Sequence, residues 1–307
     1  MNDSISQEEH SILGLKWEDG LPFGLFLNLR NNYYEKVNLV NLRLSYRNLD
    51  PVRNICLNYR PDNTDQSGYS KCLKFPTRGR KCEPCKAEEQ IFAAGLHHAH
   101  NRDRGSLNSK VLKHLERPNY LYVAVFQDGS IKVGTSTADR IETRLHEQGA
   151  FLASIICETI DGFLVRSLED IVTDELGIVQ AISIKKKMNG LLQPLPRNEI
   201  GKTLENACGQ VEELLNSLSL AGFTMVMKHW ENSSINSETW QLINHYPSSL
   251  RKGAHDLILV DFCGRIAAFQ RETDPSYYAV DLGELFGVVV EFGLFQADDL
   301  NIQGHLF

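Results

Sequence analysis

The sequence predicts a fold of the α+β class, in which antiparallel strands and helices occupy different stretches of the chain. Apolar and polar residues alternate over residues 40–46, the pattern of a half-buried strand. A two-residue turn signal, Asp128-Gly129, separates two strand-like runs. Apolar residues recur at helical spacing over residues 203–220. We therefore expect a small antiparallel sheet with helices in the centre of the chain, flanked by β-rich terminal regions.

The central stretch, residues 119–148, begins as a β-hairpin. Residues 120–127 are rich in β-branched and aromatic side chains, which favour strands. The Asp-Gly pair that follows supplies the positive φ angles of a tight hairpin turn, so residues 130–134 should return antiparallel.

A short helix is expected directly after this hairpin. Thr137 is a candidate N-cap, and Gly149 is a candidate for the left-handed residue that ends the helix. Arg140 and Arg144 lie one turn apart on this helix. A third strand is expected over residues 151–160.

A second helix, predicted over residues 162–176, carries a carboxylate on its apolar face. Glu169 interrupts the apolar stripe. A carboxylate in that position costs free energy unless it is paired, protonated or bound to a cation. Two interpretations stay open: a salt bridge to Arg144 or Lys132, or a bound Mg²⁺ ion.

Four of the seven cysteines fall in a loop-rich segment, at positions 56, 72, 82 and 85. The spacing Cys82-Glu-Pro-Cys85 lets both sulfurs reach one tetrahedral ion. Cys56 and Cys72 would complete a four-cysteine zinc site. A segment this poor in apolar residues needs something to order it, and a structural zinc ion would do so. The alternative is four reduced cysteines without a metal.

Three histidines, His97, His98 and His100, are reserve ligands for such a site. The alternative interpretation is an exposed helix end, because nothing in the sequence fixes these rings toward a ligand. No HExxH pattern is present, so a catalytic zinc ion is not expected.

Charge is unevenly distributed along the chain. The net charge of −7 argues against a general nucleic-acid binder. Residues 71–117, however, hold eleven Lys and Arg against five Asp and Glu, a balance of +6, which leaves −13 for the remainder. Such a basic segment could follow the phosphates of DNA or RNA. Its alternative interpretation is a solvated basic face without a partner.

The sequence also suggests a compartment and a domain order. Residues 1–10 lack the features of a signal peptide, and the longest apolar stretch is too short to span a bilayer, so a cytoplasmic location with reduced thiols and no membrane contact is expected. We expect four consecutive segments: an N-terminal β region (1–50), a cysteine-rich basic segment (51–117), a core (118–180), and a helix with a C-terminal β domain (181–307).

The hairpin and the helix after it resemble the GIY-YIG nuclease superfamily. Tyr122, in the tripeptide Leu-Tyr-Val, matches the tyrosine of the first strand, and Lys-Val-Gly ending at Gly134 matches the second tripeptide, with Lys132 in place of its tyrosine. Arg144 matches the helical arginine, and Glu169 matches the metal-holding glutamate of a later helix. The order of a cysteine-rich segment, this core and a late β-hairpin is also similar to an uncharacterised prokaryotic family.

This resemblance implies a GIY-YIG-like core and a metal-dependent phosphodiesterase that acts on DNA or RNA. Tyr122 would orient or deprotonate the attacking water, Arg144 would stabilise phosphoryl charge, and Glu169 would hold Mg²⁺. Lys132 would serve as a general acid or phosphate clamp. Two alternatives are an inactive, zinc-containing nucleic-acid-binding module and an enzyme for a small phosphorylated or nucleotide-like substrate.

Overall fold

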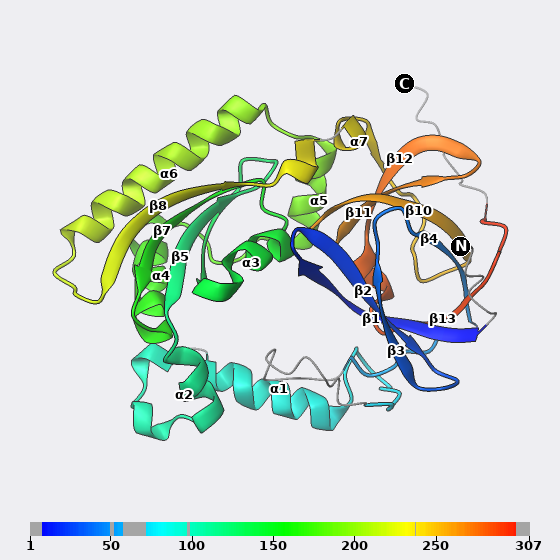
Figure 1. Ribbon diagram of the computed structural model, residues 1–307, viewed down its shortest axis with the longest axis horizontal. Coiled ribbons are helices and arrows are strands. Elements are labelled where there is room, and N and C mark those ends of the chain that lie inside the picture. Colours follow the sequence, from blue (N-terminus) through cyan, green and yellow to red (C-terminus); the bar gives the residue numbers. More distant parts are fainter. Residues whose placement is uncertain (1–7, 50–51, 58–71, 97–98, 237, 299–307) are drawn as a thin grey trace. The chain divides into compact units, whose positions relative to one another are not determined.

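The computed structural model describes five stretches of the chain, residues 8–49, 52–57, 72–96, 99–236 and 238–298 (Figure 1). The described residues form an α+β structure, which confirms the predicted fold class, and contain seven α-helices and two sheets. They divide into two compact units. Residues 1–87 with 237–307 contain the first, here called the terminal unit, and residues 88–236 contain the second, here called the central unit.

The terminal unit is built on one sheet that the described residues form from nine strands. In spatial order these are β3 (Tyr33–Asn38), β2 (Leu21–Asn28), β1 (Glu8–Glu18), β13 (Val289–Phe292), β4 (Arg43–Asn48), β10 (Ala254–Cys263), β11 (Ile266–Arg271), β12 (Asp274–Asp281) and β9 (Ile243–His245). Strand β13 pairs antiparallel with both β1 and β4, and only β9 runs parallel to its neighbour. Strands from the two ends of the chain therefore share one sheet.

Local sequence explains the hairpins of this sheet. Asp19 and Gly20 connect β1 to β2 and both have positive φ, which a two-residue hairpin turn requires. Side chains that face inward form an aromatic-rich core, in which the Tyr46 hydroxyl donates to the Leu250 carbonyl oxygen (3.0 Å) and Trp17 donates to a backbone oxygen of the β10–β11 turn. A short helix, α7 (Glu238–Gln241), completes the described part of this unit.

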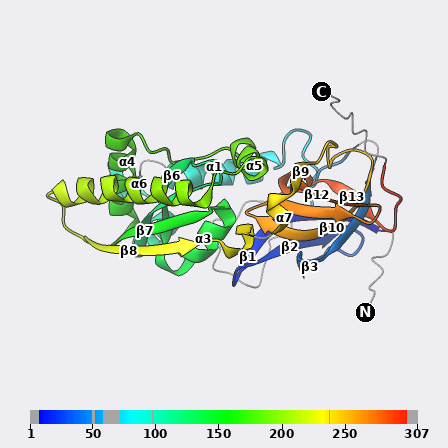
Figure 2. The same ribbon diagram turned by 90° about the horizontal axis from the view of Figure 1, so that it is seen from above.

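The central unit is built on a four-stranded antiparallel sheet. Its strands, in spatial order, are β6 (Ile131–Thr137), β5 (Asn119–Val125), β7 (Leu152–Thr159) and β8 (Phe223–Glu231). Its helices are α2 (Ser109–Leu115), α3 (Ile141–Gln148), α4 (Gly162–Leu176), α5 (Ile184–Leu192) and α6 (Arg197–Ser217), while α1 (Glu83–Leu96) begins in the terminal unit. Helices α4 and α6 pack on the strands, and α6 and α3 lie on opposite sides of β7 and β8 (Figure 2). Tyr122 and Ala124 pack with Ile141 and Leu145 of α3.

Several local predictions for this unit are confirmed. Gly129 lies in the hairpin turn with a φ of 75°, and Gly149 and Gly177 end α3 and α4 in the left-handed conformation. The expected N-cap is wrong: Thr137 makes no capping bond, because a 3₁₀ turn over Ala138–Arg140 precedes α3. Within the described ranges, no helix combines the length and the hydropathy needed to cross a bilayer.

Candidate metal centre and charged cluster

Four cysteine sulfurs converge in the terminal unit. Cys56 lies in an extended segment held by backbone hydrogen bonds, Cys72 precedes a loop, and Cys82 and Cys85 flank the start of α1. Their Sγ atoms all lie within 4.8 Å of one another, and Cys82 Sγ is 3.6 Å from the Sγ atoms of both Cys56 and Cys72. The prediction that these four side chains share one site is confirmed.

These distances suit one tetrahedral ion. A Zn–S bond of about 2.3 Å places neighbouring sulfurs roughly 3.8 Å apart in a tetrahedral site. Backbone N–H groups also point at the sulfurs: Cys82 N–H donates to Cys56 Sγ (3.2 Å), and the Cys85 N–H lowers the pKa of Cys82 to about 7. Burial raises the pKa of Cys72 and of Cys85, so these two thiols would become thiolates beside Cys82 most readily around a cation. Four cysteines so arranged could hold a zinc ion.

Of the three histidines proposed as reserve ligands, only His100 is described, and it is not part of the cysteine cluster. His97 and His98 lie outside the described residues. His100 belongs to the central unit, where its Nε2 lies 2.9 Å from a carboxylate oxygen of Asp170.

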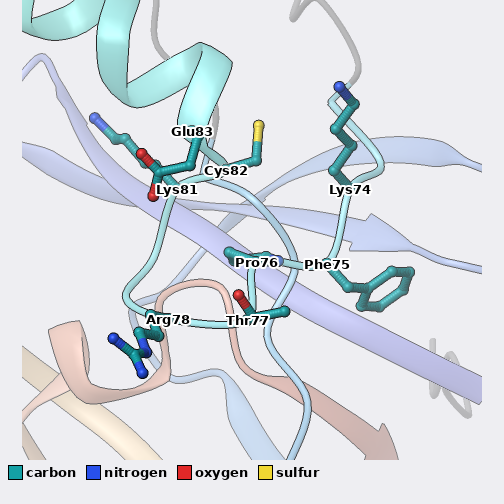
Figure 3. Close-up of a pocket in the computed structure, with 8 residues that line it drawn as sticks. All are labelled: Lys74, Phe75, Pro76, Thr77, Arg78, Lys81, Cys82 and Glu83. Carbon is teal, nitrogen blue, oxygen red and sulfur yellow. The ribbon is translucent and has the colours of Figure 1, made fainter.

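A basic cavity that the sequence analysis did not locate adjoins Cys82. It has a volume of about 380 Å³ and lies within the loop that joins Cys72 to Cys82 (Figure 3). The residues that line it are Lys74, Phe75, Pro76, Thr77, Arg78, Lys81, Cys82 and Glu83. The only sequence signal for this cavity was the excess of positive charge in residues 71–117.

A second group of functional candidates lies in the central unit. Tyr122 extends from β5, Lys132 from β6, Arg144 from α3 and Glu169 from α4. Tyr122 is fully buried, and its hydroxyl makes no hydrogen bond with the described residues. The Lys132 ammonium lies over the Tyr122 ring, 5.7 Å from its centroid. These four residues were predicted as one catalytic set, and their roles stay predictions.

These side chains lie within range of one another's charges, as the causes of their pKa shifts indicate. Burial and, to a smaller extent, the Arg144 charge lower the pKa of Lys132 to about 8, while Glu169 opposes the shift. Burial raises the pKa of Glu169, against the opposing charges of Arg166, Lys132 and Arg144. Burial likewise raises the pKa of the Tyr122 phenol, which therefore stays protonated at neutral pH.

The charges lie close together, but few are paired directly. Among the described residues, Glu169 makes no ion pair with Arg144 or Lys132, which was one interpretation of its position. Arg144 instead lies 3.8 Å from Glu147, whose other carboxylate oxygen accepts from Arg140 (2.9 Å). Glu169 therefore lies within the field of several cations without forming an ion pair with Arg144 or Lys132.

The sequence analysis missed two cations of this group. Arg166 stands one helical turn before Glu169 on α4, and burial lowers its pKa. Lys187 of α5 donates to the Gln148 carbonyl oxygen (2.7 Å), and its charge reaches Lys132. The three-residue spacing from Arg166 to Glu169 could have identified Arg166 from the sequence. For Lys187, the sequence offered only its position in a run of three lysines. We call Tyr122, Lys132, Arg144, Arg166 and Glu169 the charged cluster.

The fold and these sites define an α+β protein with a four-cysteine centre in one unit and a charged cluster in the other. The chain belongs to the family described as "Protein of unknown function (DUF2797)", whose sequence model matches residues 60–247. No curated protein and no solved structure matches the chain.

This membership corrects the resemblance drawn from the hairpin. The matched family is not the GIY-YIG superfamily, and nothing in the comparisons or the fold shows a GIY-YIG core. The resemblance depended on a hairpin, one arginine and one glutamate, with Tyr120 and Lys132 at positions of glycine and tyrosine. A tight hairpin before a helix is a common local arrangement, so these few positions did not identify a superfamily.

Proposed function

We propose that the central unit binds a phosphodiester of DNA or RNA at the charged cluster and hydrolyses it with the help of Mg²⁺. The observation that carries this proposal is that several cations act on one carboxylate without forming an ion pair with it. Lys132, Arg144 and Arg166 come from three different elements and face Glu169, and none of them has an ion pair with it among the described residues.

Burial makes this arrangement costly in the absence of a ligand. Lys132 is only 4% exposed and has no hydrogen-bond acceptor among the described residues. A buried ammonium without a partner destabilises the folded protein. A phosphate group would supply the missing acceptors, because its oxygens accept charge-assisted hydrogen bonds from ammonium and guanidinium groups.

Each side chain then has a distinct task. Arg144 and Arg166 would hold the non-bridging oxygens, whose charge grows in the transition state. Lys132 would clamp the phosphate and supply a proton to the leaving oxygen. Tyr122, whose phenol stays protonated, would orient the attacking water rather than deprotonate it.

Glu169 is the candidate ligand for Mg²⁺. Its carboxylate is partly accessible and has no ion pair among the described residues. Mg²⁺ is commonly held by one or two carboxylates together with substrate phosphates, so a single glutamate fits this chemistry. When bound, the ion would polarise the phosphate and lower the pKa of a bound water.

Further cations favour a polyanion over a small ligand. His114 lies within the field of Arg166, Arg117 and Arg140, each of which lowers its pKa in addition to burial. Arg117 and Arg140 pair with Asp139 and Glu147, but they add further cations between the charged cluster and α2. Nucleic acid binds to surfaces rich in cations through its phosphates.

One observation favours the second candidate, an enzyme for a small phosphorylated or nucleotide-like substrate. Tyr122 is fully buried and Lys132 nearly so, which suits a terminal phosphate that can enter the cluster.

The third candidate, a nucleic-acid-binding module without cleavage, is supported by the basic cavity beside the cysteines.

We further propose that the four cysteines hold a structural zinc ion. The sulfur distances and the N–H donors that point at the sulfurs support a closed four-thiolate site. The absence of an open ligand position among these four residues makes a structural role better supported than a catalytic one.

Hydrolysis assays separate the candidates. Labelled single- and double-stranded DNA and RNA, and a small phosphodiester such as bis(p-nitrophenyl) phosphate, are incubated with the full chain in Mg²⁺ or in EDTA. We expect cleavage that requires Mg²⁺ and is lost in Glu169→Gln but kept in Glu175→Gln, an exposed position on the same helix. Salt-sensitive binding without cleavage would favour the binding module, and turnover of small phosphate esters alone would favour the second candidate.

A further inference from the structure

The loop between Cys72 and Cys82 is held in place at both ends. The carbonyl oxygen of Lys74 accepts from Cys56 N–H, and the carbonyl oxygen of Arg80 accepts from Leu57 N–H, each at 2.8 Å. The two cysteines that flank this loop belong to the four-cysteine centre. The side chains between them are therefore presented on a backbone with fixed ends, which lowers the entropy lost when a ligand binds.

This loop presents cations around a cavity. Lys74 and Arg78 are exposed and have no ion pair with the described residues, and Lys81 adds a third positive charge. Lys74 and Lys81 rise on either side of Cys82, while Arg78 extends from the far end of the loop (Figure 3). Among the described residues, Glu83 is the one carboxylate that lines the cavity. The lining thus favours an anion.

An aromatic ring stands beside these cations. Phe75 is 52% exposed and projects away from the loop in Figure 3. The Arg53 guanidinium, which also pairs with Glu9, lies 5.9 Å from its centroid, so a cation borders the ring. An exposed aromatic ring leaves apolar surface in contact with water, which is unfavourable unless a ligand covers it. A ring that lies among cations suits a ligand that combines a flat base with a phosphate.

We infer that this loop, residues 73–81, binds single-stranded nucleic acid. Lys74 and Arg78 contact successive phosphates, and a base stacks on Phe75. Single strands meet these requirements because their bases are free to leave the stack, whereas duplex bases already stack on one another. The inference rests on the proposed function only in the choice of nucleic acid as the ligand.

Fluorescence anisotropy of labelled oligo(dT) and oligo(U) tests this inference. The full chain carries Glu169→Gln, so that binding is measured without cleavage. Replacing Lys74 and Arg78 by Gln should weaken binding and make the salt dependence, log K against log [salt], shallower by about 1.4, as expected for two lost phosphate contacts. Phe75→Ala should weaken binding by about 5- to 150-fold.

Two control variants test whether losing any exposed cation or aromatic side chain of the terminal unit weakens binding. Lys252→Gln removes another exposed cation of the terminal unit, and Tyr33→Ala removes another aromatic side chain, which is 63% exposed. Both should bind oligo(dT) like the parent chain. Zinc content is measured in every sample, because the loop cations could instead balance the thiolate charge. Loss of zinc in the Lys74 and Arg78 variant, with unchanged binding by Phe75→Ala, would overturn the inference.

Other outcomes overturn it too, and they are separable from failure of the proposed function. Parent-like affinity in the loop variants, equal affinity for duplex, or no affinity for any oligonucleotide would each refute this loop as a single-strand site. Hydrolysis is scored separately with wild-type protein and the small phosphodiester. Loop-dependent binding without hydrolysis would refute the proposed catalysis and leave this inference standing.

Discussion

The Tyr122 ring lies directly over Gly134, its cross-strand partner. The two residues are paired in the register of β5 and β6. A Cβ atom at position 134 would lie 2.5 Å from both Cζ and Oη of the tyrosine, closer than such atoms approach in folded proteins. Glycine at this position leaves the space in which the phenol lies beside Lys132.

Gly134→Ala should therefore displace the Tyr122 ring. We expect the free energy of unfolding to fall by about 1–3 kcal/mol, as in other overpacked cores, and hydrolysis to fall with it. Denaturant unfolding checks the first effect. Gly209→Ala is the matched control, since nothing lies within 4 Å of that position in α6 and the change should stabilise the helix by roughly 0.5–1 kcal/mol. Equal stability in wild type and Gly134→Ala would show that the ring has room to move.

Features with a local cause were predictable from the sequence. The turn at Asp128-Gly129 and the helix ends at Gly149 and Gly177 follow from residues that tolerate positive φ. Position 137 failed as a cap because the choice between a 3₁₀ turn and an α-helical start depends on packing around α3.

Features with a distant cause were not predictable. Strand β13 lies between β1 and β4, a pairing that joins residues near positions 10, 47 and 290. Alternation marks such strands but does not give their order in the sheet. The four cysteines were found because the Cys82-Glu-Pro-Cys85 spacing suits a tetrahedral ion, but the 3.6 Å distance between their sulfurs came only from the fold. Arg166 was missed because its charge matters only once α4 lies beside β6.

Lys132 should give the protein a pH-dependent stability. Its pKa is lowered from 10.5 to about 8 in the folded state, so the folded protein binds fewer protons than the unfolded chain between these values. The destabilisation is therefore complete below about pH 8 and disappears as pH rises to 10.5. Its full size is up to about 3 kcal/mol.

Lys132→Met tests this sign. Relative to wild type, the free energy of unfolding of the variant should be highest below pH 8. This advantage of the variant should shrink as the pH rises toward 10.5. The pH trend is the readout, because methionine also changes packing. Lys185→Met, at an exposed position of α5, should show no comparable trend. A constant difference for Lys132→Met across this range would contradict a buried, unpaired ammonium.

The four-cysteine centre predicts one zinc ion per chain. We expect Cys82→Ser to lose the metal and to unfold at lower denaturant, because Cys82 Sγ is close to two partner sulfurs. Cys208→Ala removes a buried thiol from α6, far from any cysteine of the centre in sequence, and should keep the metal. Elemental analysis measures the zinc content of both purified variants. Equal zinc content in the two variants would refute the site.

Asp161 positions the helix that carries Arg166 and Glu169. Its Oδ1 accepts from the backbone N–H groups of residues 163 and 164 (3.0 and 2.8 Å), and its Oδ2 accepts from Arg104 (3.0 Å). The carboxylate thus accepts hydrogen bonds from two N–H groups at the start of α4. Its negative charge also interacts favourably with the positive end of the helix dipole. Asp161→Ala should lower the free energy of unfolding by about 1 kcal/mol, within a range of roughly 0.5–2 kcal/mol.

Asp161→Asn separates the cap from the charge. Asparagine caps helices about as well as aspartate but cannot form the ion pair with Arg104. Because that pair is largely exposed on the arginine side, its loss should cost little, and Asn should restore most of the stability that Ala removes. If the cap holds α4 in register, hydrolysis should follow the same order, with wild type and Asn above Ala. Equal destabilisation by Asn and Ala would instead assign the effect to Arg104, and the start of α4 would not need its cap to present Glu169.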